Sequence, residues 1–303
     1  MVDVHNRVYP GRATTVKALA ESERARDPKY RHRRWVAVQG SRVVGYAAYG
    51  QPVYGYHPNK FAVDVAVLPE YRRRGIGAAL YDQLVAGLAA LQPQILRADA
   101  YGDLPEGVQF LEQRGFWEVF CETPMHLQVD TFDATPYAGL EERLRALGIH
   151  VRTLSDLAGD ADRDRQAYDL YWEVTEDVPR EGELNVMPFR EWAKWTLKDP
   201  LVPHDGYLIS VCGDEYVGLA EFGTTPGSDV LQGGLVGVKR AFRRKGVALA
   251  MHVRAIAYAR AHGYARIATS TAAANVGMRA LYERLGFVRQ PDWIQMEKVC
   301  VAD

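Results

Sequence analysis

The sequence predicts an α/β (α+β) fold made of two tandem domains, each with a mixed, mostly antiparallel sheet flanked by helices. Three observations support this prediction: the length of the chain, a motif that occurs twice, and the order of strand and helix patterns around each occurrence. At 303 residues the chain suits two domains of about 150 residues, each able to bury its own core.

The repeated motif is "EYRRRGIGAAL", which returns as "AFRRKGVALAM". Its loop glycines, Gly75 and Gly246, are 171 residues apart (246 − 75), and the Gly-Phe pairs that end "FLEQRGF" and "LYERLGF" keep the same offset (286 − 115 = 171). Upstream, "VVGYAAYG" matches "YVGLAEFG", with 173 residues between Gly45 and Gly218. Three matched landmarks in one order indicate a tandem duplication.

In the first copy, apolar runs around a polar turn predict a β-hairpin over residues 35–50. The alternating segment "KFAVDVAVL" (60–68) predicts a strand that leads into the basic loop. After the loop, leucines at 80, 84 and 88 recur every four residues, which is typical of a helix with one apolar stripe.

The second copy repeats this order. It has hairpin-like residues 207–223, a strand-like run at 230–238, and a helix over Val247–Ala261 that Gly263 ends. Residues 266–272 then read as a strand, 275–286 as a helix closed by glycine, and 287–299 as a strand. Each copy therefore reads as a meander, a strand-loop-helix crossover, a short helix and a final strand.

These patterns place the first domain at residues 1–128, a linker with a short helix at 129–148, and the second domain at 149–303. Ile149–Leu157 opens the second copy as a strand, but by the same spacing the first copy would need residues before Met1. We therefore expect the first domain to be degenerate, to lack its first strand, and to leave a sheet edge that something must cover.

Composition limits the classes of function. The formal charge of −1 gives no general field for nucleic acid, and three widely spaced cysteines suit a reducing compartment. We find neither an apolar signal core nor about 18 consecutive apolar residues, so we expect a cytoplasmic protein without membrane or nucleic-acid partners. The histidines show no metal-ligand spacing, and a Gly-x-Ser-x-Gly elbow is absent. A monomer is preferred, with a homodimer as the alternative.

The basic loop has the features of an anion site. A strand that leads into Arg-x-x-Gly-x-Gly/Ala at a helix start presents successive N–H groups and the positive helix end to a phosphate. No Gly-Lys-Ser/Thr follows as in a P-loop, and Gly75-Ile76-Gly77 lacks the third glycine of a dinucleotide fingerprint. The alternative to an anion site is that the basic residues of the loop form a solvent-exposed run of charges.

The strand, the Arg-x-x-Gly-x-Gly/Ala loop, the helix and the later "LYERLGF" together resemble the GNAT superfamily of acetyl-CoA-dependent N-acetyltransferases, and the doubling resembles its tandem members. The resemblance implies that loop amides bind the pyrophosphate of coenzyme A and that the preceding strand splays to receive the pantetheine arm. The residues implied for acetyl-CoA are Val236, Val238, Arg243, Arg244, Lys245, Gly246, Val247, Ala248 and Asn275, and in the first copy Val65, Val67, Arg72, Arg73, Arg74, Gly75, Ile76 and Gly77.

The resemblance also assigns catalytic roles. Tyr282 stands where the family carries the general acid, and a tyrosine stays protonated at neutral pH, so it can donate a proton to the leaving thiolate. At the offset of 171, Tyr282 corresponds to Leu111 and Asn275 to Leu104, so the second copy is the expected catalytic domain. Tyr282 could instead pack in the core, and Asn275 could be a helix N-cap. Glu221 is the candidate base, with an exposed strand glutamate as the alternative.

The segment 168–197 is expected to wall the acceptor site. It places acidic residues, among them Glu173, Glu176, Asp177, Glu181 and Glu183, between aromatic ones such as Trp172. Trp172, Glu173 and Glu176 are the candidate substrate contacts, because acids and aromatics suit a cationic amine. An amphipathic helix with a solvated acidic loop explains the segment equally well. The sequence thus predicts an N-acetyltransferase for a primary amine of a small molecule or peptide, with a non-catalytic acetyl-CoA-binding or partner-presenting module as the alternative.

Overall fold

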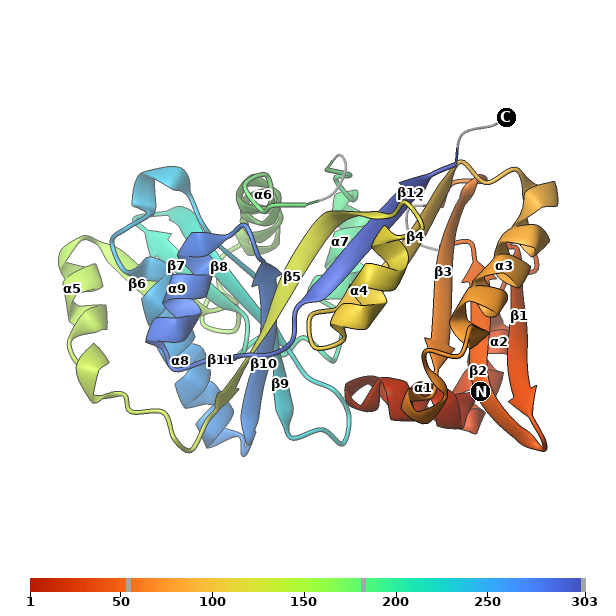
Figure 1. Ribbon diagram of the computed structural model, residues 1–303. Coiled ribbons are helices and arrows are strands. Elements are labelled where there is room, and N and C mark those ends of the chain that lie inside the picture. Colours follow the sequence, from red (N-terminus) through yellow and green to blue (C-terminus); the bar gives the residue numbers. More distant parts are fainter. Residues whose placement is uncertain (53–55, 181–183, 301–303) are drawn as a thin grey trace. The chain divides into compact units, whose positions relative to one another are not determined.

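The computed structural model describes residues 1–52, 56–180 and 184–300 and divides into two compact units (Figure 1). The N-terminal unit comprises Met1–Phe120 together with the C-terminal end of the chain from Trp293, and the C-terminal unit comprises Cys121–Asp292. Both are α/β units with mostly antiparallel sheets flanked by helices, which confirms the predicted fold class.

The N-terminal unit has one five-stranded sheet in the order β1-β2-β3-β4-β12 among the described residues. Among its described strands, only β3 and β4 run parallel, and the other neighbours are antiparallel. Its elements are α1 (Val2–Val8), α2 (Val16–Ala25), β1 (His32–Gln39), β2 (Arg42–Gly50), β3 (Lys60–Val67), α3 (Ile76–Leu88), β4 (Ile95–Tyr101), α4 (Pro105–Glu112) and β12 (Trp293–Val299).

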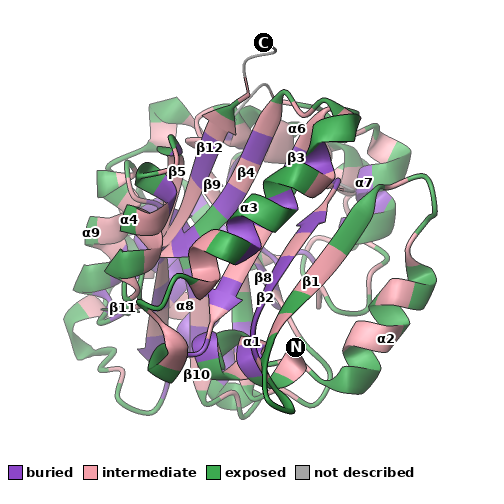
Figure 2. Cartoon of the chain, turned by 45° about the vertical axis from the view of Figure 1, so that its right-hand side comes forward, coloured by how far each residue is buried: buried purple, intermediate pink, exposed green. Residues whose placement is uncertain are grey.

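The expected hairpin, strand and helix of the first copy are β1, β2, β3 and α3. No described strand lies beyond β1 on its edge of the sheet, and the chain before β1 forms helices α1 and α2. In Figure 2, β1 and α2 are exposed or half-buried, whereas β2 and β4 carry buried residues. Glu23 of α2 accepts hydrogen bonds from Arg34 (2.8 Å) and interacts with His32 (3.1 Å), so α2 is tied to the start of β1.

The C-terminal unit has its strands in the order β6-β7-β8-β9-β10-β5, with β11 paired to β5. Here β9 and β10 form the parallel pair. Its elements are β5 (Trp117–Gln128, which enters the unit at Cys121), α5 (Leu140–Ala146), β6 (Ile149–Thr153), α6 (Arg163–Thr175), α7 (Phe189–Thr196), β7 (Leu208–Cys212), β8 (Glu215–Gly223), β9 (Val230–Val238), α8 (Val247–Ala261), β10 (Arg266–Ala272), α9 (Val276–Arg284) and β11 (Val288–Arg289).

The two copies exchange their final strands, so the units do not follow the expected boundaries at 128 and 149. β5 ends the first copy in sequence, yet from Cys121 it belongs to the C-terminal unit, where it pairs with β10 from Glu122↔Ala272 to Gln128↔Arg266. β12 ends the second copy, yet it belongs to the N-terminal unit and pairs with β4. In both units the exchanged strand lies antiparallel beside the second strand of the parallel pair, which is β10 in the C-terminal unit and β4 in the N-terminal unit.

The helices that follow the loops pack against the core through their apolar residues. On α3, Leu80, Leu84 and Leu88 are at most 5% exposed and belong to the core of the N-terminal unit, as their spacing predicted. α8 has the predicted bounds, and Gly263 (φ 76°) follows its end. Within the described residues, no helix is long and apolar enough to cross a membrane.

Candidate active sites

The two loops that the sequence predicts to bind an anion, residues 72–77 and 243–248 and called the anion loops below, have the same backbone conformation. Between β9 and α8, Arg244 (φ 63°) and Gly246 (φ 90°) adopt positive φ, and between β3 and α3 the same holds for Arg73 (60°) and Gly75 (79°). Glycine adopts such angles without strain, whereas arginine does so rarely. The first helical N–H groups have no partner inside the helix, so each loop directs them, with the positive helix end, to one place.

The first arginine of each loop braces the backbone. Arg243 donates from Nε to the carbonyl oxygen of Val238 (2.8 Å), and Arg72 donates from Nε to that of Val67 (3.1 Å). Each bond holds the end of the strand against the loop. Part of each side chain is therefore engaged in holding the loop in shape.

A carboxylate accompanies the loop of the C-terminal unit. Asp177, just after α6, accepts hydrogen bonds from Arg240 and from Arg243. These bonds, with Arg240 the larger contributor, hold the pKa of Asp177 well below its usual range. Asp177 was expected among the acidic residues around the acceptor, but it lies at the anion loop.

A fork opens in the sheet of the C-terminal unit. β9 and β10 pair only through residues 230–232 and 266–268. The segment 233–238 of β9 pairs with β8 but not with β10, and a cavity of about 680 Å³ lies along it; this segment is called the unpaired part of β9 below. Many residues expected to bind the cofactor line this cavity: Val236, Val238, Arg243, Arg244, Gly246, Val247, Ala248 and Asn275. Lys245 is not among the lining residues; its ammonium lies 4.9 Å from the centre of the Phe242 ring.

Asn275 has the capping geometry that was one of its two expected roles. Its Oδ1 accepts a hydrogen bond from the backbone N–H of Met278 (3.2 Å) at the start of α9. Because Asn275 also lines the cavity, capping and proximity to a ligand coexist at this residue.

Tyr282 lies at the base of the fork and not in the lining of the cavity. The residue is 2% exposed, its ring packs against those of His252 and Phe287, and its hydroxyl lies 3.2 Å from Thr269 Oγ1. A Cβ atom on Gly233 would be 2.9 Å from that same Oγ1. Thr269 therefore stands between the phenol and β9, at the point where β9 and β10 separate.

Glu221 lies on β8 beside the unpaired part of β9. Its side chain is packed against Gly234, where a Cβ atom would be 3.3 Å from the Glu221 carboxyl carbon. Burial raises the pKa of Glu221 to about 7. Burial and, as a smaller cause, the charge of Glu221 raise the pKa of Tyr171 to about 12, and the same two causes raise the pKa of Tyr207 well above its usual value. Glu221 is thus a half-buried carboxyl among tyrosines, which differs from an exposed strand glutamate.

The expected substrate residues do not line the cavity of the C-terminal unit. Trp172 packs edge-on against Tyr171 and Tyr168, Glu173 forms a 3.2 Å salt bridge with Lys239, and Glu176 is exposed. Glu181 and Glu183 lie outside the described residues.

α6 contributes Val174 to the lining instead. A Cβ atom on Gly237 would be only 2.4 Å from Val174 Cβ, so α6 approaches the backbone of β9 closely. Glycines inside a strand signal such an approach, and the run of Gly233, Gly234 and Gly237 could have indicated it.

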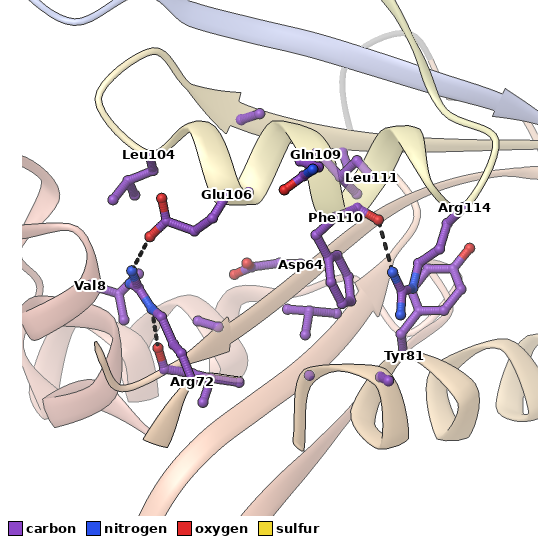
Figure 3. A pocket seen from close by; sticks show the side chains of 18 of the residues that line it. Val8, Asp64, Arg72, Tyr81, Leu104, Glu106, Gln109, Phe110, Leu111 and Arg114 are labelled. Atoms are coloured by element: carbon purple, nitrogen blue, oxygen red, sulfur yellow. Dashed lines mark hydrogen bonds and ion pairs between the residues drawn. The ribbon is translucent and has the colours of Figure 1, made fainter. Parts of the chain in front are cut away.

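The N-terminal unit has a cavity of similar size, about 650 Å³, beside its own loop (Figure 3). Of the residues expected to bind the cofactor there, Val65, Val67, Arg72, Arg73, Gly75 and Gly77 line it. Arg74 and Ile76 do not, and Arg74 donates to the Glu70 carbonyl oxygen (2.9 Å). Leu104 and Leu111 are in the lining, and Glu106 of α4 pairs with Arg72 across it (Figure 3).

Two carboxylates at this cavity were not singled out from the sequence. Asp64 of β3 and Asp99 of β4 line it, and Figure 3 shows Asp64 in the space between Arg72 and Phe110. The available signal was the charge of Asp64 in the middle of the strand "KFAVDVAVL", whose other residues after Lys60 are all apolar.

Comparison with protein families gives two matches. Residues 165–287 match the acetyltransferase (GNAT) family, and residues 30–118 match an acetyltransferase (GNAT) domain. The first match lies in the C-terminal unit and the second in the N-terminal unit. A search of curated proteins finds no match.

Solved structures share the fold. A GCN5-related N-acetyltransferase from Sphaerobacter thermophilus aligns with a TM-score of 0.68 and 20% identity over 98% of this chain and 90% of that one. A tandem GNAT protein from the clavulanic acid biosynthesis pathway aligns with a TM-score of 0.60 and 19% identity over 100% and 94% of the two chains.

Proposed function

The chain belongs to the GNAT acetyltransferase family, with one GNAT domain in each unit, and on that premise we propose that it moves an acetyl group from acetyl-CoA to a primary amine of a small molecule or peptide. We place the reaction in the C-terminal unit. The observation that carries this proposal is the continuous lining that joins the loop amides at Gly246 to the unpaired part of β9.

The chain's own residues fit a bound coenzyme A. Main-chain N–H groups after Gly246 would hold its diphosphate, since they lack helical partners and the loop is preshaped by Arg244 and Gly246. The unpaired part of β9, which includes Val236 and Val238, leaves backbone groups free to bond the pantetheine amides. When bound, the cofactor supplies an activated thioester.

Glu221 is the base in this proposal. An ammonium group has to lose a proton before it attacks, and a carboxyl with a pKa of about 7 is balanced between its two states at neutral pH. Tyr282 is the proposed acid, because burial raises its pKa and keeps the phenol protonated. A main-chain N–H near Val238 would stabilise the tetrahedral oxyanion.

The burial of Tyr282 favours a second candidate function. A phenol that is 2% exposed and screened by Thr269 suits a core residue as well as an acid. In that case both units would bind acetyl-CoA, or present a surface to a partner, without turnover.

A thiol-release assay with acetyl-CoA and a panel of primary amines separates the two functions. We expect acetyl-CoA-dependent release of thiol by the wild-type protein and a lower rate of release in Tyr282→Phe and in Glu221→Gln. Calorimetry should show that the wild-type protein and both variants bind acetyl-CoA. Binding without release from any amine would select the non-catalytic module. Absence of acetyl-CoA binding would refute both functions.

A further inference from the structure

Two cavities of the N-terminal unit meet at a pair of carboxylates. The first holds the anion loop, and the second, of about 460 Å³, lies toward α2 and β12. The residues common to both linings are Tyr9, Val63, Asp64, Asp99 and Tyr101. We propose that this junction is a second acetyl-transfer site, in which Asp64 takes a proton from a small amine that also carries a carboxylate. The inference rests on acetyl-CoA as the donor but not on chemistry in the C-terminal unit.

The junction lies where the sheet forks. β3 and β4 pair from Lys60↔Ile95 to Val63↔Ala98 and no further, so Asp64 and Asp99 are the first residues beyond the paired part. On this face Asp64 is opposite Ala48 of β2, and Asp99 is opposite Gln295 of β12. A carboxylate is therefore held at the place where a thioester in the first cavity would meet an amine in the second.

A chain of hydrogen bonds leads away from Asp64. The Tyr46 hydroxyl lies 2.6 Å from Asp64 Oδ2 and 3.2 Å from His5 Nδ1, and His5 Nε2 lies 3.0 Å from the carbonyl oxygen of Arg12. Since that carbonyl only accepts, Nε2 carries a proton. In one state His5 Nδ1 carries a proton and donates to Tyr46, and Tyr46 donates to an ionised Asp64. In the other state Asp64 carries the proton and donates to Tyr46, and Tyr46 donates to His5 Nδ1. Every hydrogen bond of the chain is made in both states. The three side chains can thus relay one proton.

One buried donor at the first cavity has no partner among the described residues. Tyr81, which is 6% exposed, lines that cavity, and its hydroxyl makes no hydrogen bond within the described chain. At the second cavity the indole of Trp293 interacts with Asp99; burial raises the pKa of that carboxyl, and the Trp293 contact lowers it. Unsatisfied buried donors are uncommon in folded proteins, so we expect a ligand or an ordered water at the Tyr81 hydroxyl.

The second cavity also defines the class of amine. Its lining contains the two aspartates, His32 and four arginines: Arg12, Arg26, Arg34 and Arg97. Arg26 and Arg34 pair with Glu23, and Arg97 pairs with Glu297. The guanidinium of Arg12 lies 4.5 Å from the centre of the Tyr101 ring and makes no salt bridge within the described chain. An ammonium group suits the aspartates, and a carboxylate on the same molecule suits Arg12.

The reaction balances with these groups alone. Asp64 accepts one proton from the ammonium group and passes it through Tyr46 to His5. The neutral nitrogen then attacks the thioester carbon, the C–N bond forms and the C–S bond breaks. A second proton leaves the nitrogen and ends on the thiolate, which gives the amide and free coenzyme A.

The test measures thiol release by the full chain with two matched pairs of amines: β-alanine against ethylamine, and 4-aminobutyrate against propylamine. We expect the amines with a carboxylate to be preferred, Asp64→Asn to lose ~10²-fold or more in kcat/KM, and Tyr282→Phe to retain this activity. Asp82→Asn, an exposed change on α3, is the control. Full activity in Asp64→Asn, or its loss in Tyr282→Phe, would overturn the proposal.

The relay has its own readout. Four titratable groups of the described chain face Asp64: His5 of α1, Tyr9 just after α1, Tyr46 of β2 and Asp99 of β4. Burial raises the pKa of Asp64, and the hydrogen bond from Tyr46 lowers it. Tyr46→Phe removes that bond, so the acidic limb of kcat/KM for 4-aminobutyrate should move to higher pH. An unmoved limb contradicts the relay.

Calorimetry with 4-aminobutyrate in the absence of acetyl-CoA separates this inference from the proposed donor. Weaker binding in Asp64→Asn than in Asp82→Asn supports the amine site even if acetyl-CoA is not the donor, and equal binding overturns it.

Discussion

Substituting Gly246 by alanine tests whether the main chain of the C-terminal loop binds the cofactor. Gly246 has φ 90°, a conformation that costs an L-residue about 1–2 kcal/mol, and its new Cβ atom would be 3.2 Å from Leu140 Cδ1. If the loop relaxes to relieve this strain, the amides shift by a few tenths of an ångström. One bond to a charged phosphate contributes about 1.5–3 kcal/mol, so we expect acetyl-CoA binding to weaken ~10–100-fold.

Gly263→Ala is the matched control. Gly263 also has positive φ (76°) and follows the same helix, but a Cβ atom added there would meet nothing within 4 Å, and the residue is at the opposite end of α8. Both variants should lose about 1–2 kcal/mol of folding stability in a denaturant titration, because both carry the same backbone strain. Only Gly246→Ala should weaken acetyl-CoA binding in calorimetry. Equal affinity in both variants would refute the idea that these amides hold the diphosphate.

Four further predictions concern the fork of the C-terminal unit. The kcat/KM should rise with an inflection near pH 7 as Glu221 ionises, and Glu221→Gln should remove this limb. Because the folded-state pKa of Glu221 (about 7) exceeds the ordinary 4.5, folding takes up a proton between these values and stability falls as pH rises through them. Glu221→Gln should therefore be the more stable chain at pH 8, by at most about 3 kcal/mol, and equal melting curves would contradict this burial. Tyr282→Phe should lower kcat ~10²-fold or more if the phenol is the general acid. An unchanged kcat together with a loss of about 1 kcal/mol in folding stability would show that Tyr282 is a core residue that bonds Thr269 and not the acid. Gly237→Ala should cost about 1–3 kcal/mol by collision with Val174, and the double variant with Val174→Ala should recover part of it; additive losses would contradict the contact.

The sequence predicted where both loops lie, because the glycines of the motif recur at a fixed spacing. Gly75 and Gly246 both stand directly before a helix and have positive φ, and α8 has the bounds that its pattern predicted. Arg73 and Arg244 at positive φ were not predictable, since arginine carries no local preference for that conformation.

The exchange of β5 and β12 could not be predicted from the sequence. Both segments read as the last strand of a copy, and strand periodicity identifies a strand but not its neighbour. Only the pairing of residues far apart in the chain, such as Trp293 with Tyr101 and Arg266 with Gln128, shows which sheet each strand completes.

The carboxylate at the fork is common to both units in space but not in sequence. In the C-terminal unit it is Glu221 on β8, packed against Gly234 of β9. In the N-terminal unit the position that corresponds to Glu221 is Ala48, and opposite Ala48 stands Asp64 on β3. The carboxylate therefore lies on a different strand in each unit, but in both it is beside the parallel pair. A position-by-position comparison of the two copies finds Ala48 in place of Glu221 and so suggests that the first copy has lost its carboxylate. If a base is needed at that place, the first copy need not be degenerate, and its departure from the motif at Leu104 and Leu111 marks a different proton route.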